Sequence, residues 1–223
     1  MPKRPVTTVT TTRDRRLTRR GADTREKILQ ATVACIVRSG FAEMTVENVM
    51  AEAGISRGSV LHQFPNRVAL AIETMARTME VVVMEARRLA AVIDDPFSRL
   101  ADYAQIVWDT HSMPEGLALT EILQAARWDE ELAEGIRPFI QKAEDAVAVE
   151  LVELAEAAGF PNPQVMVARG WLLVASARGL IIESRLGYTR PIIAEAVEEM
   201  KRSHRRYCES VVPLTQRIGY SQS

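Results

Sequence analysis

The stretch AGISRGSVLHQFPNR, residues 53–67, combines a glycine turn with a short helix that stops at a proline. Gly54 can adopt the positive φ of a tight turn, and Ser56 can cap the helix that follows. Upstream, Thr45 can cap a helix that runs to Ala53. Two helices joined by a three-residue turn form a helix-turn-helix motif, so this stretch predicts the fold of the N-terminal part.

The rest of the chain also has helical periodicity. Apolar residues recur at helical spacing from Thr24 to Ser39, and Gly40 supplies a stop. Pro65 ends the short helix, and Asn66 can cap a long one. Further helical segments begin near Pro96, Pro114, Leu132, Gln164 and Pro191. No strand-like alternation competes with them, so we predict an all-α protein of about nine helices.

Composition limits the class of protein. The chain has 223 residues, of which 47% are hydrophobic, enough for one or two domains. Cys35 and Cys208 lie far apart without metal or disulfide spacing, which favours a reducing compartment. No apolar segment resembles a signal peptide, and the longest uncharged apolar run, residues 170–177, lies between two arginines. We therefore expect a cytoplasmic protein without a membrane span.

The net charge of -1 hides a strong division along the chain. Residues 1–67 hold 12 Lys and Arg against 6 Asp and Glu, whereas the remainder holds 16 against 23. Residues 1–22 alone carry seven basic residues and one acid, and we expect them to form a flexible basic arm. A solvated tail without a specific role is the alternative. The division favours a polyanionic partner for the N-terminal part.

The short helix presents a polar face. On a 3.6-residue period, Ile55, Val60 and Phe64 point to the core, and the other side chains remain available to a DNA major groove. Arg57 suits a bidentate contact to guanine, and Gly58 permits close backbone approach. Alternatively, Ser56 is only a cap and the arginines are ordinary solvent-facing charges. The predicted DNA-binding residues are Thr45, Ser56, Arg57, Gly58, Ser59, Leu61, His62, Gln63 and Arg67, together with Arg19 and Arg20 of the arm.

Residues 24–75 resemble the N-terminal domain of TetR-family transcriptional regulators. The resemblance is carried by Arg25, Ile28, Leu29, Ala31, Gly40, Thr45, Val49, the run Ala53-Gly54-Ile55-Ser56, Gly58, Phe64, Arg67 and Leu70. The chain departs from the usual family pattern at four positions: Leu61 replaces a tyrosine, Glu47 an arginine, Met50 a small residue and Arg67 a lysine. These departures affect individual DNA contacts more than the mode of binding.

The resemblance implies that the variable second domain binds a small effector and that the last two helices pair across a homodimer. Residues 168–187 mix small residues with large apolar ones, which permits close helix approach. An ordinary core helix is the alternative. The predicted dimer residues are Trp171, Ala175, Arg178 and Ile182.

For the effector we expect a pocket between the middle helices, around the break at Pro114. Its predicted lining residues are Tyr103, Trp108, His111, Met113 and Trp128, although aromatic residues at helical spacing are also common in plain cores. A mainly apolar or aromatic ligand would suit these side chains. The sequence does not identify that ligand.

The predicted organisation has four parts: an arm at 1–22, a helix-turn-helix domain at 23–69, a helical effector-binding and dimerisation domain at 70–212, and a tail at 213–223. We predict a ligand-responsive regulator of transcription, a repressor in preference to an activator, that binds double-stranded DNA as a homodimer. No cofactor or metal is expected. An enzyme is disfavoured because no catalytic motif occurs, and a helical adaptor that does not bind specific DNA is the main alternative.

Overall fold

The computed structural model describes residues 12–188 and 190–213, with side chains from residue 21 onward. These residues form ten helices and no strand, which confirms the all-α prediction but adds one helix to the expected nine. The helical segment predicted to begin near Pro96 is divided at Asp102 into two helices. The chain forms two compact units that divide between Leu70 and Ala71.

The first unit contains α1 (Thr12–Ser39), α2 (Val46–Ala53), α3 (Arg57–Gln63) and the first turn of α4 (Arg67–Ala91). The predicted caps are present: Thr45 accepts from Asn48 N at 3.1 Å, and Asn66 accepts from Ala69 N at 2.7 Å. The three helices enclose a small core of fully buried side chains, including Ile28, Ile36, Met44, Val49, Val60 and Phe64.

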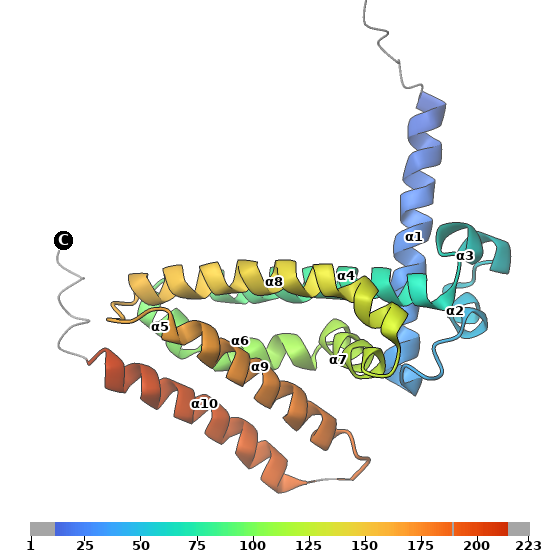
Figure 1. Ribbon diagram of the computed structural model, residues 1–223. Helices are drawn as coiled ribbons and strands as arrows, with labels where there is room; N and C mark the ends of the chain where they lie inside the picture. The colour runs from blue at the N-terminus through green and yellow to red at the C-terminus, as the bar shows by residue number, and fades with distance from the viewer. Residues whose placement is uncertain (1–11, 189, 214–223) are drawn as a thin grey trace, which may run out of the picture. The chain divides into compact units, whose positions relative to one another are not determined.

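The expected start of the first helix and end of the arm are wrong. α1 begins at Thr12 (Figure 1), so residues 12–22 continue the helix that the sequence predicts from Thr24. Arginine and leucine are good helix formers, and an already formed helix extends at little cost even through Gly21. The remainder of the arm, residues 1–11, and the side chains of Arg19 and Arg20 lie outside the described part.

The second unit contains the rest of α4 and six further helices. These are α5 (Pro96–Ala101), α6 (Tyr103–Ser112), α7 (Pro114–Ala126), α8 (Glu130–Ala157), α9 (Val165–Ser184) and α10 (Pro191–Val211). Helix α9 packs against α6, α8 and α10. In Figure 1, α9 and α10 run side by side, and they are joined by a short connection.

Helix α9 is the one described helix that is long and apolar enough to cross a membrane by composition alone. It nevertheless carries Arg169 and Arg178, and its inner face belongs to the core. Leu173 and Ala177 pack there with Ala104 and Val107 of α6. Burial therefore explains the apolar residues on the inner side of α9. The apolar residues on its outer side require a separate explanation.

Candidate functional site

The turn between α2 and α3 has the geometry that the sequence predicts. Gly54 adopts φ 62 and ψ 38, and its N–H donates to Met50 O. Ser56 caps α3 by accepting from Ser59 N at 3.3 Å, and the two hydroxyls lie 3.0 Å apart. Val60 and Phe64 are buried on the inner side, and Ile55 is half-buried. The rotation of α3 about its axis is thereby fixed.

Arg57 is exposed at the first turn of α3 and forms an ion pair with Glu47 of α2, which is also exposed. From the sequence, Glu47 would repel phosphate unless it points away or accepts from cytosine, and this pair is not foreseen. The two residues are ten positions apart, and only the turn geometry brings them together. Because both side chains are more than half exposed, water screens the pair and a stronger partner can displace it.

The other predicted residues of α3 differ in their exposure. Gly58 and His62 are exposed, whereas Ser59, Leu61 and Gln63 are half-buried. A Cβ at Gly58 would meet nothing within 4 Å, so the outer surface of the helix is open at that point. We call Arg57, Gly58, Leu61, His62 and Gln63 the outer face of α3.

Arg67 braces the first unit. Its Nε donates to Met44 O at 2.8 Å, and a terminal nitrogen donates to Phe41 O at 2.6 Å. Its guanidinium also lies over the Phe41 ring, 4.6 Å from the centroid. These contacts join the start of α4 to the loop between α1 and α2. They favour a positioning role for Arg67 over the phosphate contact that the sequence suggests.

A small cavity of about 70 Å³ lies within the second unit, lined by residues of α4, α6, α7, α8 and α9. We call it the Arg178 cavity. Its walls are mostly apolar, and Tyr103, Thr110, His111 and Arg178 supply its polar groups. A second cavity of about 240 Å³, the Arg87 cavity, shares Val83, Ala86, Tyr103 and Val147 with it.

Burial controls the ionisation of the polar groups in the Arg178 cavity. Desolvation and the charge of Arg178 lower the pKa of His111 to about 4, against a weaker opposing effect of its bond to Val107 O. Desolvation raises the pKa of Tyr103 to about 12. Desolvation also lowers the pKa of Arg178 to about 10. At neutral pH the cavity therefore has a neutral imidazole, a neutral phenol and one guanidinium cation.

Only part of the predicted pocket is assembled. Tyr103 and His111 line the Arg178 cavity, but Trp108 packs on the cluster between α6 and α9, and Met113 lies at the junction of α6 and α7. Trp128 is 85% exposed, so its predicted place in a pocket is wrong. It follows the end of α7, where the chain turns toward α8. An aromatic side chain on such a surface turn does not reach the hydrophobic core.

Two of the predicted dimer residues are half-buried and two are exposed. Trp171 and Arg178 are half-buried and line the Arg178 cavity. Ala175 is exposed and Ile182 is 40% exposed, although both share a helix face with Trp171 and Arg178 at spacings of three and four residues. The sequence could not separate the buried from the exposed positions, because large apolar residues occur all around this helix. Met79 and Val82 of α4 also line the cavity, and they are not predicted from the sequence.

The outward side of α9 has a regular apolar stripe. Its residues recur at alternating spacings of three and four, and all of them are exposed: Val165, Ala168, Leu172, Ala175, Gly179 and Ile182. Leu172 is 59% exposed, and a Cβ at Gly179 would meet nothing within 4 Å. Such spacing is the signature of a seam between two packed helices. We call these residues the α9 stripe.

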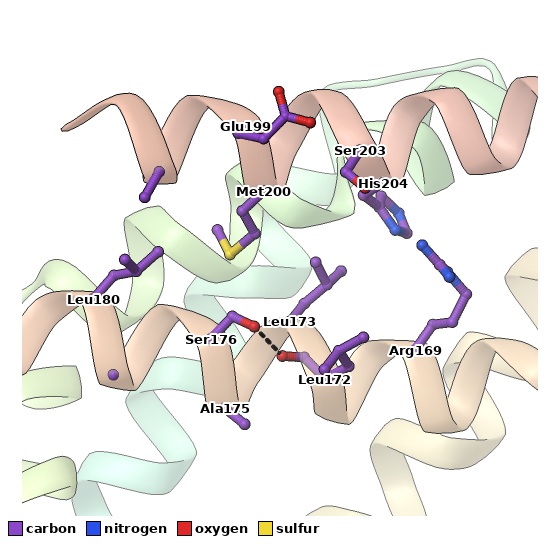
Figure 2. Close-up of a pocket in the computed structure, with 12 residues that line it drawn as sticks. Arg169, Leu172, Leu173, Ala175, Ser176, Leu180, Glu199, Met200, Ser203 and His204 are labelled. Atoms are coloured by element: carbon purple, nitrogen blue, oxygen red, sulfur yellow. Dashed lines mark hydrogen bonds between the residues drawn. The ribbon is translucent and has the colours of Figure 1, made fainter. Parts of the chain in front are cut away.

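A groove between α9 and α10 runs beside the stripe (Figure 2). Leu172, Ala175 and Gly179 belong to both, and Met200 and Ser203 of α10 form the other wall. Arg169 extends from α9 toward His204 in Figure 2, and its guanidinium lies 3.5 Å from the Tyr207 ring centroid. The guanidinium of Arg169 thus contacts an aromatic ring of α10.

The first unit thus has two short helices joined by a three-residue turn, with a polar outer face on the second helix. This arrangement defines a helix-turn-helix domain of the DNA-binding class. Residues 28–74 match the profile of the bacterial regulatory proteins of the tetR family. The chain therefore carries a helix-turn-helix domain similar to that of the TetR-family DNA-binding transcriptional regulators.

A curated relative and two solved structures extend the similarity beyond the first unit. The HTH-type transcriptional regulator CymR of Pseudomonas putida is 26% identical over an alignment of 178 residues that covers 74% of this chain and 81% of CymR. The fatty acid degradation regulator FadR from Bacillus halodurans has a TM-score of 0.62 at 16% identity, over 85% of this chain and 95% of FadR.

A transcriptional regulator from Saccharomonospora viridis, solved in complex with choline, has a TM-score of 0.62 at 15% identity. The match covers 84% of this chain and 96% of that protein. At such low identity the two solved structures support the fold alone. Because each of these matches spans most of both chains, the second unit also has the architecture of these regulators.

Proposed function

We propose that this protein is a ligand-released repressor that binds a near-palindromic operator as a homodimer. The outer face of α3 is the observation that carries the proposal. Arg57, Gly58 and His62 are exposed on it, and its rotation is fixed by the burial of Val60 and Phe64. A helix with these properties suits insertion into a major groove, where its first turn approaches the bases.

Within this proposal Arg57 reads a base and Glu47 acts on Arg57. Arginine binds the O6 and N7 atoms of guanine in a bidentate manner. In the free protein the carboxylate of Glu47 holds the guanidinium, and guanine replaces it on the operator. Gly58 leaves room for the DNA backbone or a base edge beside Arg57. Arg19 and Arg20, whose side chains lie outside the described part, remain proposed phosphate or minor-groove contacts.

The α9 stripe supports a homodimer. A second copy of the chain would cover the stripe with its own α9 through a two-fold axis, because each stripe offers the same apolar residues to the other. Ala175 and Gly179 at its centre allow the two helix backbones to approach closely. The two outer faces of α3 would then read two half-sites, one or more helical turns apart.

The Arg178 cavity is the proposed effector site. Alone it is too small for most ligands, but together with the Arg87 cavity it reaches the lower end of the range of about 300–1,000 Å³ that is usual for ligand pockets. The Saccharomonospora viridis regulator was solved with choline, which is a cation. A guanidinium in the wall of this cavity disfavours a cation here. Because the cavity involves α4, a ligand that distinguishes two positions of α4 could alter DNA binding.

Selection of bound fragments from a genomic library tests the proposal. We expect the recovered fragments to share an inverted repeat, and footprinting of one fragment to show two protected half-sites. Binding should weaken steeply as the salt concentration rises. Uniform recovery of unrelated fragments, or the absence of binding at low salt, would reject a sequence-specific regulator and favour a helical adaptor.

A further inference from the structure

Arg178 is a half-buried cation that forms no ion pair with any described acid. Its Nε is inaccessible to solvent and has no hydrogen-bond acceptor among the described residues. Glu144 influences it through space, but no ion pair joins Arg178 to any acid in the described part of the chain. Burying a guanidinium costs free energy unless an anion or acceptor offsets it. The charge of Arg178 therefore makes an unfavourable contribution to the free energy of the folded protein, and an anionic ligand can remove it.

The surroundings of Arg178 restrict the ligand. His111 does not offset the charge of Arg178, because its ring is neutral at pH 7 and its Nδ1 donates to Val107 O at 3.0 Å. The hydroxyl of Thr110 already donates to Ile106 O at 2.8 Å. The remaining walls near Arg178 are mainly apolar, with Val107, Trp171 and Val174 among them. The cavity thus combines one positive charge with a large apolar surface.

A second arginine on the same helix provides a contrast. The Nε of Arg169 is also buried without a hydrogen-bond partner, but its guanidinium lies against the face of Tyr207. An aromatic face partly compensates a cation. Among the described residues, the arginines that lie over aromatic rings are Arg25, Arg67, Arg127, Arg169 and Arg190. Arg178 does not belong to this group, and its charge is turned toward a cavity.

We infer that the effector is an organic monocarboxylate with an apolar body, and that Arg178 binds its carboxylate. The planar guanidinium matches the two carboxylate oxygens, and the dry surroundings strengthen the pair. The apolar body extends past Tyr103, which belongs to both cavities, into the Arg87 cavity. This inference rests on the proposed function, since it specifies the ligand of the proposed effector site.

Calorimetric titration of the full-length protein with ligands matched in body and different in head group tests the inference. The probes are octanoate, octanol and octylamine, and phenylbutyrate with its corresponding alcohol and amine. We expect at least one carboxylate to bind, with an affinity at least about tenfold higher than that of its alcohol, and we expect the amine to bind most weakly. Comparable affinities for the three head groups, or no binding by either carboxylate, would overturn the inference.

Variants separate the charge of Arg178 from its bulk. Arg178→Met should abolish the preference for the carboxylate while affinity for the alcohol persists, and Arg178→Lys should retain a reduced preference. Arg137→Met, the same change at an exposed site on α8, should leave all affinities unchanged. Thermal unfolding of Arg178→Met reports on folding, and we expect a midpoint equal to or above that of the wild type, since an unpaired charge is removed.

The outcome for DNA binding is measured separately, without ligand, on a selected operator. If the protein binds the operator specifically and Arg178→Met keeps the carboxylate preference, the inference is wrong and the proposed function stands. If no operator can be selected, the proposed function is wrong, whereas the head-group preference still tests whether Arg178 binds carboxylates.

Discussion

Arg57 is held by Glu47 in the absence of DNA, which lowers the cost of ordering its long side chain at the interface. We predict that Arg57→Ala weakens binding to a selected operator by about 1–3 kcal/mol and relaxes the preference at one base pair. Mobility shifts on operators with single substitutions measure both effects. Glu47→Gln serves as the control, because it keeps Arg57 and should retain the preference. An unchanged preference in Arg57→Ala would remove this residue from the base readers.

Arg67 has a different role in the same domain. Arg67→Ala removes the hydrogen bonds from a charged donor to the carbonyls of Met44, Phe41 and Ala42. We predict that the first unit is destabilised by about 1–3 kcal/mol and that affinity falls to a similar extent for all DNA sequences. Urea unfolding followed by circular dichroism, with operator and unrelated DNA compared in parallel, distinguishes this variant from Arg57→Ala. Full stability of Arg67→Ala would contradict the bracing role.

His111 makes stability depend on pH. Its pKa is about 4 in the folded chain, below the ordinary value of 6.5. As pH falls through this range, the unfolded chain takes up a proton that the folded chain does not, so stability is present near neutral pH and is lost on acidification. We expect His111 to contribute a loss of about 3 kcal/mol by pH 4. Burial also lowers the pKa of His204, which adds to the same trend.

Urea unfolding at several pH values checks this dependence. His111→Gln keeps a donor for Val107 O but does not titrate, so it should flatten the fall in stability between pH 6.5 and 4. The pKa of Glu85 is also lowered, by its hydrogen bond to Arg88, but this contribution to the pH dependence is the same in both proteins. An equal slope in the wild type and the variant would show that His111 is not the group responsible.

At the scale of single elements, sequence signals that act over a few residues are reliable. The helix caps follow from the oxygen-bearing side chains of Thr45, Ser56 and Asn66. The left-handed turn follows from the glycine at position 54, which adopts a positive φ. The orientation of α9 does not follow from the sequence, because large apolar residues such as Leu172 and Ile181 occur on both of its sides. Only the packing of the neighbouring helices buries Ile181 and leaves Leu172 exposed.

The α9 stripe leads to a prediction about association. A charge at Leu172, the most exposed large residue of α9, would have to be desolvated in a paired helix seam. Leu172→Glu should therefore convert the dimer to a monomer in sedimentation and reduce operator affinity. Val149→Glu on α8, where the valine is 57% exposed, introduces the same charge outside the stripe and should leave the dimer intact. A dimeric Leu172→Glu protein would place the interface elsewhere.

At the scale of the whole molecule, two properties are distributed along the chain. The basic excess of residues 1–67 is read directly from the sequence, and so is the acidic excess of the remainder. The effector cavities cannot be read from the sequence, because their walls come from helices that are far apart in sequence and each helix contributes only a few side chains. For this reason the sequence alone places Arg178 at the dimer interface, although its charge acts on His111 in the core.

The basic excess leads to a prediction about the N-terminal segment, where residues 1–20 hold seven Lys and Arg. Each phosphate that they neutralise releases counterions, so the slope of log affinity against log salt becomes shallower by about 0.9 for each phosphate that is no longer bound. Deleting residues 1–20 should therefore weaken operator binding and flatten its salt dependence. Because α1 begins at Thr12, a full-length variant with Arg13, Arg15, Arg16, Arg19 and Arg20 replaced by Gln is the matched control for the shortened helix. If both proteins bind as the wild type does at every salt concentration, the segment does not bind phosphate, and α2 and α3 supply the interface.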